Sequence, residues 1–207
     1  MSSISLTYFD SPGRAEPVRL ALRLGGLHFT DKRLNFQQFG ELRASGALPL
    51  GSVPLLEIDG VTYVQTAAML RYVAKIGDAS LYPADPLAAL AVDSVIDCIN
   101  DTWYGALMPS LFERDVERKM SMRAQFVAGA MTKVLTYIDG VLARSGGPFV
   151  AGEALSLADL TLVGPLLQIR GGRLDGVGPE LLDAWPRIGA LVDAYLAHPR
   201  IVALSQG

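Results

Sequence analysis

The sequence predicts an α/β domain followed by an all-α domain. Over residues 4–76, alternating β-type patterns and helical periodicity follow one another in the order β-α-β-α-β-β-α. From Leu87 onward almost every segment has the helical spacing of apolar residues. Between them, residues 79–85 lack periodicity and contain Pro83. We therefore expect a first domain over 1–78, a linker over 79–85 and a helical domain over 86–207.

The first strand, turn and helix organise the rest of the chain. Residues 4–9 alternate as in a half-buried strand, and Ser11-Pro12-Gly13 is typical of a turn. Glu16 and Pro17 suit the first turn of a helix that ends at Gly25-Gly26. This arrangement places Tyr8 at the carboxyl end of a strand and Arg14 at the amino end of a helix. Ligands of open α/β sheets bind at such places.

The remaining elements of the first domain follow from similar signals. Asp59-Gly60 stands between two β-rich runs and predicts a hairpin, with Pro54 at the start of the first run. Thr66 is the expected N-cap of the next helix. The elements we expect are a strand over 27–34, parallel to the first, a weak helix over 36–45, and a helix over 67–76.

The second domain reads as a succession of helices. Met108-Pro109 predicts a break or kink in the first of them. Ser156 and Asp159 have the spacing of a capping box, with Asp in place of Glu or Gln. The helices we expect cover 87–112, 114–142, 160–169, a short segment at 181–182, and 188–196, which His198-Pro199 closes.

Composition limits the class of protein. The chain has 207 residues, is 50% hydrophobic and carries a formal net charge of −3, which argues against a general nucleic-acid binder. Its single cysteine, Cys98, permits no internal disulfide and fits a reducing compartment. We expect no signal peptide, because no basic region precedes an apolar run, and no bilayer-spanning stretch; residues 155–169 come nearest.

Tyr8 is the first candidate for chemistry. A strand tyrosine is usually a packing residue, but a hydroxyl at the strand end could also donate a hydrogen bond to an anionic sulfur or oxygen. A phenol has a reference pKa near ~10 and a thiol near ~8.5, so the phenol stays a donor while the thiol ionises. One charge-assisted bond of roughly 1.5–3 kcal/mol lowers a thiol pKa by about one to two units.

Three further positions each allow two interpretations. Arg14 could bind a ligand carboxylate or form an ion pair with Glu16 or Asp10. An ordinary trans bond is the commoner state at Val53-Pro54, whereas a cis bond would expose the Val53 backbone for pairing with a peptide ligand. Gln65-Thr66 could simply cap a helix or offer its free N–H groups to a carboxylate.

Several features of the helical domain are weaker candidates. Asp93, Asp97 and Asp101 have the spacing of one helix face, which could be solvated or could meet a cation. The aromatic and apolar group Trp103, Tyr104, Leu107 and Met108 is more often core than pocket. Cys98 is expected to be a buried small residue rather than a nucleophile. We expect no metal site, because the two histidines are isolated, and no phosphate-binding or hydrolase motif occurs.

Taken together, these motifs resemble the cytosolic glutathione transferases. The resemblance rests on Tyr8-Phe9 with the run 13–19, on residues 53–60, on Gln65-Thr66, and on 149–152 followed by 156–160. It covers nearly the whole chain and is strongest to the tyrosine-using classes, especially sigma. It implies a thioredoxin-like first domain, a cis peptide before Pro54, and a cytoplasmic homodimer.

The resemblance also implies a function and a site. Tyr8 would stabilise the thiolate of glutathione, the co-substrate, for attack on an apolar electrophile, with Ser11 as a minor rival. The residues implied to bind glutathione are Tyr8, Arg14, Phe39, Arg43, Ser52, Val53, Pro54, Gln65, Thr66 and, from the neighbouring subunit, Asp101. Those implied to line the electrophile pocket are Phe9, Trp103, Leu107 and Met108.

The alternatives are a glutathione-dependent isomerase or peroxidase of the same fold, or a non-enzymatic relative. Four positions depart from the family pattern. Phe39 stands where Trp is common, Arg43 where Lys is, Ser52 where Gln or Lys is, and Thr66 where Ser is usual. These departures concern the end of the site that would hold the glycyl carboxylate, together with Thr66.

Overall fold

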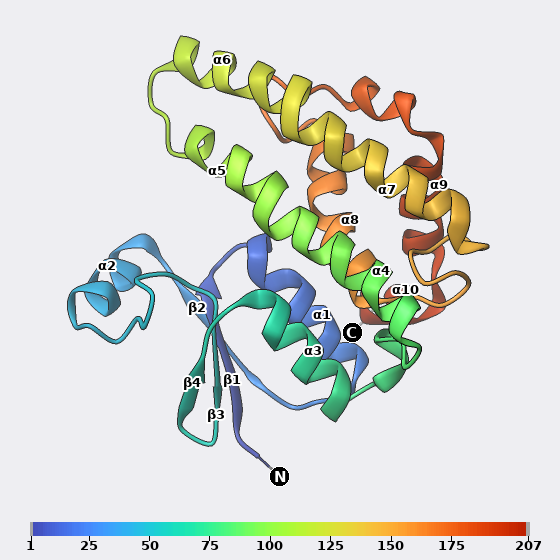
Figure 1. Ribbon diagram of the computed structural model, residues 1–207. Coiled ribbons are helices and arrows are strands. Elements are labelled where there is room, and N and C mark those ends of the chain that lie inside the picture. Colours follow the sequence, from blue (N-terminus) through green and yellow to red (C-terminus); the bar gives the residue numbers. More distant parts are fainter. Residues whose placement is uncertain (1, 206–207) are drawn as a thin grey trace. The chain divides into compact units, whose positions relative to one another are not determined.

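The computed structural model describes residues 2–205, and contacts divide the chain into two units (Figure 1). Met1–Leu81 is an α/β unit and Tyr82–Gly207 is a helical unit. The predicted fold class, a mixed sheet with helices followed by an all-α part, is confirmed. The boundary between the units lies within residues 79–85.

The α/β unit is built on one mixed four-stranded sheet with the strand order β2-β1-β3-β4. β1 pairs with β2 in parallel and with β3 antiparallel, and β3 and β4 form the antiparallel hairpin. Helices α1 and α3 pack together on one side of the sheet, and α2 lies on the other (Figure 1). The elements are β1 (Ile4–Phe9), α1 (Glu16–Leu24), β2 (Thr30–Leu34), α2 (Phe36–Ala44), β3 (Leu55–Ile58), β4 (Val61–Tyr63) and α3 (Thr66–Ile76), with 3₁₀ turns η1 (Gly13–Ala15) and η2 (Ala79–Leu81).

Burial explains why these segments take their places. Leu6 on β1 and Leu56 on β3 are register partners and are both buried. On α1, Val18, Ala21 and Leu22 recur at helical spacing and have no exposed surface. Helix α2 has no buried residue, so packing contributes little to its stability.

Two predictions for this unit need correction. The second strand begins at Thr30, not Leu27, because the chain first leaves α1 through a turn at Gly25-Gly26. Thr66 is not the N-cap of α3. Gln65 occupies that position with a φ of 75° and makes no capping hydrogen bond, and Thr66 is a buried first residue of the helix.

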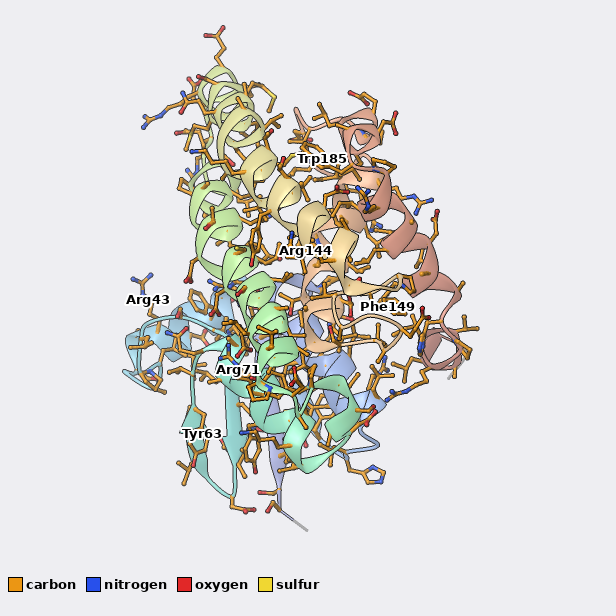
Figure 2. The ribbon with its side chains drawn as sticks, turned by 45° about the vertical axis from the view of Figure 1, so that its right-hand side comes forward. Arg43, Tyr63, Arg71, Arg144, Phe149 and Trp185 are labelled. Carbon is orange, nitrogen blue, oxygen red and sulfur yellow. The ribbon has the colours of Figure 1, made fainter. Side chains whose placement is uncertain are left out.

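The helical unit has a core of long helices around α8, most of whose residues are buried. α8 contacts both α4 and α9, and α7 also packs on α9. Trp185, labelled in Figure 2, joins the start of α9 to α7 through a hydrogen bond from its Nε1 to Thr136 Oγ1 at 3.2 Å. The elements are α4 (Pro86–Asp97), a π-helical segment η3 (Cys98–Trp103), α5 (Tyr104–Leu111), α6 (Val116–Phe126), a second π segment η4 (Val127–Met131), α7 (Thr132–Ser145), α8 (Leu157–Arg170), a 3₁₀ segment η5 (Pro179–Ala184), α9 (Pro186–Ala197) and α10 (Pro199–Ser205).

The predicted break at Pro109 is wrong. α5 continues through Pro109 to Leu111, and the irregular part of this helix is the π segment η3 further upstream. A proline this close to a helix end removes only one late backbone hydrogen bond. His198-Pro199 closes the preceding helix as predicted, since α9 ends at Ala197, but Pro199 then starts a further helix, α10, that the sequence did not predict.

The combined run Val116–Ser145 passes the length and composition test for a membrane span. An 18-residue window in it has a mean hydropathy of 1.3, and 39% of that window is buried. By that test alone, the expectation that no stretch could span a bilayer is wrong. The core helix of a soluble protein passes the same test, and here α6 packs on α5 and α7 on α9.

The predicted capping box at the start of α8 is confirmed, and its acid is fully buried. Asp159 accepts hydrogen bonds from Ser156 N at 2.8 Å, Ser156 Oγ at 2.7 Å and Val150 N at 3.0 Å. Burial raises the pKa of Asp159 to about 6, although these bonds act to lower it. The carboxylate therefore ties the loop at Val150 to the first turn of the central helix.

We predict that Asp159→Ala lowers the free energy of unfolding by about 2–6 kcal/mol. The substitution leaves two buried N–H groups without an acceptor, and each such group costs about 1–3 kcal/mol. Urea denaturation at pH 7 measures the change. Asp183→Ala, at an exposed position in the same unit, is the control and should stay within about 0.5 kcal/mol of the native chain.

The same carboxyl gives this prediction a pH dependence. Its pKa is about 6 in the folded protein against 3.8 in the unfolded chain, so the folded state binds more protons between these values. Lowering the pH from 7.5 to 5 should therefore stabilise the native chain relative to Asp159→Asn, which cannot titrate. The free energy of unfolding of the native chain minus that of Asp159→Asn should increase as the pH falls from 7.5 to 5. A value that stays constant or decreases would contradict the raised pKa of Asp159.

Candidate functional site

Arg19 on α1 organises the loop that follows β1. It is 3% exposed, and a buried guanidinium is costly unless acceptors surround it. Because three of its acceptors belong to the loop backbone, Arg19 fixes the path of the chain between β1 and α1. The acceptors are the carbonyls of Phe9 (3.3 Å), Ser11 (2.9 Å) and Pro12 (3.2 Å), and the carboxylates of Glu16 (3.1 Å) and Asp31 (3.1 Å).

Glu16 and Asp10, the two acids predicted as possible ion-pair partners of Arg14, both bond to other arginines. Glu16 pairs with Arg19, and Asp10 pairs with Arg33 at 3.4 Å. Arg33 also bonds Asp31 at 2.7 Å, so the acid that meets Arg19 is shared with a second cation. Both acids proposed for Arg14 thus have other cationic partners.

Tyr8 lies near the end of β1, with its hydroxyl against the start of η1. Its Oη accepts a hydrogen bond from the backbone N–H of Arg14 at 3.2 Å. The guanidinium of Arg19 lies 5.8 Å from the centre of the Tyr8 ring, within cation–π range. The structure thus brings Tyr8 and Arg14 together, through the Arg14 backbone.

Aromatic contacts connect β1 to α2. The ring of Phe9 meets Tyr8 edge-on at 5.4 Å between centroids, and it packs on Phe36 at 5.2 Å and Phe39 at 5.0 Å. Phe36 is 77% exposed, whereas Phe9 and Phe39 are half-buried. Since α2 has no buried residue, these rings are the main apolar anchor of its first turns.

The loop before β3 contains three more of the predicted glutathione-binding residues, Ser52, Val53 and Pro54. The Val53–Pro54 bond is cis, as the resemblance implies. Ser52 is exposed beside it, and Arg43 projects outward from α2 (Figure 2). Arg43 Nε lies 4.0 Å from where a Cβ on Gly51 would stand, so α2 and this loop are neighbours.

Gln65 has an uncommon backbone conformation directly before α3. A φ of 75° is rare for a residue other than glycine, and such conformations cluster at ligand-binding positions. The side chain of Gln65 is exposed, and the N–H groups that begin α3 follow it. A helix start of this kind can receive a carboxylate.

The candidates of the helical unit differ in accessibility. Trp103 is 1% and Leu107 2% exposed, and the Trp103 ring packs edge-on against Phe126 at 5.0 Å. Both belong to the core of this unit, which leaves the half-buried Met108 as its accessible apolar candidate. Asp101 is exposed in the π segment η3.

The predicted acidic helix face of Asp93, Asp97 and Asp101 is not continuous. Asp93 accepts a hydrogen bond from Tyr82 Oη at 2.8 Å, and the π segment breaks the regular spacing before Asp101. Burial, with Asp97 and Asp101 nearby, raises the pKa of the Cys98 thiol, which makes Cys98 a poor nucleophile.

Within residues 2–205, no three His, Cys, Asp or Glu side chains are grouped so that they could hold a metal ion.

The sequence assigns no function to two residues of the site. Arg19 belongs to the motif over 13–19, but its acceptors lie up to twelve residues away and only the fold shows them. The sequence indicates Gly13 only as a turn residue, whereas in the fold it also lies against the Tyr8 ring.

The fold and this site define a class of two-part chains, a thioredoxin-like unit followed by a helical unit. Residues 4–75 match the family model described as glutathione S-transferase, N-terminal domain, and residues 101–205 match glutathione S-transferase, C-terminal domain. The chain is 30% identical over 192 residues to glutathione S-transferase A3 of Mus musculus, covering 90% of this chain and 80% of that one.

Solved structures agree with this match. A glutathione S-transferase from Ascaris lumbricoides superposes with a TM-score of 0.81 at 27% identity, covering 99% of this chain and 96% of that one. A monomeric glutathione S-transferase from Necator americanus gives 0.82 at 26% identity, with coverages of 99% and 96%. The chain belongs to the glutathione S-transferase family, and it is an enzyme of that family with glutathione as its co-substrate.

We predict that Arg19→Lys lowers the free energy of unfolding by about 2–4 kcal/mol. A lysine keeps the charge but cannot reach acceptors arranged around a planar guanidinium, so buried groups lose their donors. Urea denaturation measures the loss. Arg23→Lys, an exposed position on the same helix, is the matched control; equal effects of the two variants would refute the central place given to Arg19.

Proposed function

We propose that Tyr8 stabilises the glutathione thiolate for attack on an apolar electrophile. The observation that carries this proposal is the hydrogen bond from Arg14 N to Tyr8 Oη at 3.2 Å. A phenol oxygen that accepts from the backbone still has its own O–H to donate. Directed at a sulfur anion, that O–H would supply one charge-assisted bond and keep the thiol ionised near neutral pH.

The rest of glutathione would lie along the same edge of the α/β unit. Val53, before the cis bond, would pair with the cysteinyl backbone through its own N–H and C=O. Gln65 and Thr66 would receive the γ-glutamyl carboxylate at the start of α3, which the unusual φ of Gln65 supports. Phe39 and Arg43 on α2, with Ser52 and Pro54 in the loop before β3, would hold the glycyl end. Arg14 would act beside Tyr8, at the start of η1.

The electrophile is proposed to be apolar. Phe9 in the α/β unit and Met108 in the helical unit are half-buried and apolar, which suits them to such a ligand. Trp103 and Leu107 would support Met108 from the core rather than touch the ligand, given their burial. We place the enzyme in the tyrosine-using sigma class and in the cytoplasm, on the motif around Tyr8 and the absence of any possible internal disulfide.

We predict that Tyr8→Phe keeps glutathione affinity within about threefold but lowers kcat/KM with a chloronitrobenzene about 10- to 100-fold. The loss corresponds to one charge-assisted hydrogen bond of roughly 1.5–3 kcal/mol. Steady-state kinetics and calorimetric titration with glutathione measure the two quantities.

Two variants control this experiment. Tyr137→Phe, an exposed tyrosine on α7, should behave like the native enzyme. Ser11→Ala tests the rival hydroxyl and should retain most of the activity. A native rate for Tyr8→Phe, together with a large loss for Ser11→Ala, would transfer the proposed function to Ser11.

We also propose a homodimer in which Asp101 reaches the amino group of glutathione bound to the partner. Leu87 and Leu90 on α4 are 74% and 61% exposed, and they precede Asp97 and Asp101 along the same stretch of chain. Exposed leucines grouped on one helix favour burial against a partner. The monomeric relative shows that the oligomeric state needs its own experiment.

The native enzyme should sediment with twice the mass of one chain, and the double variant Leu87→Asp/Leu90→Asp should sediment as a single chain. Each buried aspartate would cost roughly 2 kcal/mol or more. The dimer would bury four of them, two from each chain, so association should weaken by at least about 10⁵-fold. Leu111→Asp, 46% exposed at the end of α5, is the control and should remain a dimer. A native enzyme that is monomeric at micromolar concentration would contradict the proposal.

A further inference from the structure

The position of the Tyr8 hydroxyl depends on a glycine five residues later. Gly13 opens η1 with a φ of +44°, in the region that favours glycine. A Cβ built on Gly13 would lie 2.6 Å from Tyr8 Oη, 2.8 Å from Cε1 and 3.0 Å from Cζ. The first two distances are shorter than real Cβ contacts and the third is tighter than most of them, so the phenol rests directly against the Gly13 backbone.

This close approach brings the hydroxyl within reach of the next amide. The Arg14 N–H, immediately after Gly13, is the group that donates to Tyr8 Oη. A phenol oxygen has one O–H and a limited number of lone-pair directions. Once one lone pair is taken by the loop amide, the O–H is left to donate to another group.

The loop itself is held more firmly than the ring. Arg19 binds the carbonyls of Ser11 and Pro12 just before Gly13, and that of Phe9 just after Tyr8. The phenol, by contrast, is the far end of a side chain. A methyl group added at Gly13 should therefore displace the Tyr8 hydroxyl and leave the loop in place.

We propose that Gly13 is a positioning residue for the transferase reaction. Its missing side chain seats the Tyr8 phenol against the loop, where the Arg14 amide orients the hydroxyl toward the glutathione sulfur. This inference rests on the proposed function of Tyr8. Gly13 acts only through Tyr8 and does not touch the reacting atoms.

The test compares Gly13→Ala with Gly46→Ala. Gly46 lies in the same unit with a φ of +75°, and a Cβ there would meet nothing within 4 Å, so it controls for backbone strain. The readout is the pKa of the thiol of bound glutathione, from the ultraviolet absorbance of the thiolate. Gly13→Ala should raise this pKa by about one unit and lower kcat about tenfold, whereas Gly46→Ala should leave both unchanged.

A double variant separates this inference from the proposal on which it rests. If Gly13 acts through Tyr8, Gly13→Ala should add nothing to the effect of Tyr8→Phe on the thiol pKa. A raised pKa in Tyr8→Phe with a native pKa in Gly13→Ala would overturn the inference alone. A native pKa in Tyr8→Phe would overturn the proposed function of Tyr8 itself.

A second pair of variants keeps the inference testable if Gly13→Ala fails to fold. Arg14→Pro removes the backbone N–H, whereas Arg14→Ala removes the same side chain and keeps the N–H. The proline variant should show the higher thiol pKa of the two, by about half a unit or more. Equal values in the two variants would refute orientation by the Arg14 amide.

Discussion

The buried guanidinium of Arg19 is the interaction on which the site depends. A charge that is 3% exposed has to be surrounded by acceptors, and this one takes them from the end of β1, the turn, the first helical turn and β2. The hydrogen bonds of Arg19 thereby hold the loop between β1 and α1 in one conformation. A loop without such support would leave a hydroxyl free to adopt many directions, and a catalytic donor needs one.

The same constraint links fold to chemistry. With the loop fixed, Gly13 and the Arg14 amide define the surface against which the Tyr8 phenol rests. The Phe9 ring meets the Tyr8 ring edge-on and also packs on Phe39 of α2. Each contact is individually modest, but together they would place one O–H before a ligand, which is what stabilising a thiolate requires.

The sequence predicts features whose causes are local. Turn chemistry at Asp59-Gly60, the spacing of Ser156 and Asp159, and the strand–turn–helix around Tyr8 all appear in the fold because neighbouring residues decide them. The errors have other causes. α5 runs through Pro109 because only two residues of the helix follow it, so little backbone hydrogen bonding is lost. The π segment before α5 has no local sequence pattern that predicts it, and Gln65 adopts a positive φ despite its side chain. Most of the candidate site residues come from family motifs, whereas the contacts of Arg19 and Gly13 become visible only in three dimensions.

The most direct test of the account is a crystal structure of the enzyme with glutathione bound. We expect the glutathione sulfur within about 3.5 Å of Tyr8 Oη, with Oη still accepting from the Arg14 amide. That geometry would show one hydroxyl oriented by the loop and donating to the thiolate. A sulfur atom bound to Ser11 Oγ instead, with Tyr8 Oη out of hydrogen-bonding range, would contradict the central claim.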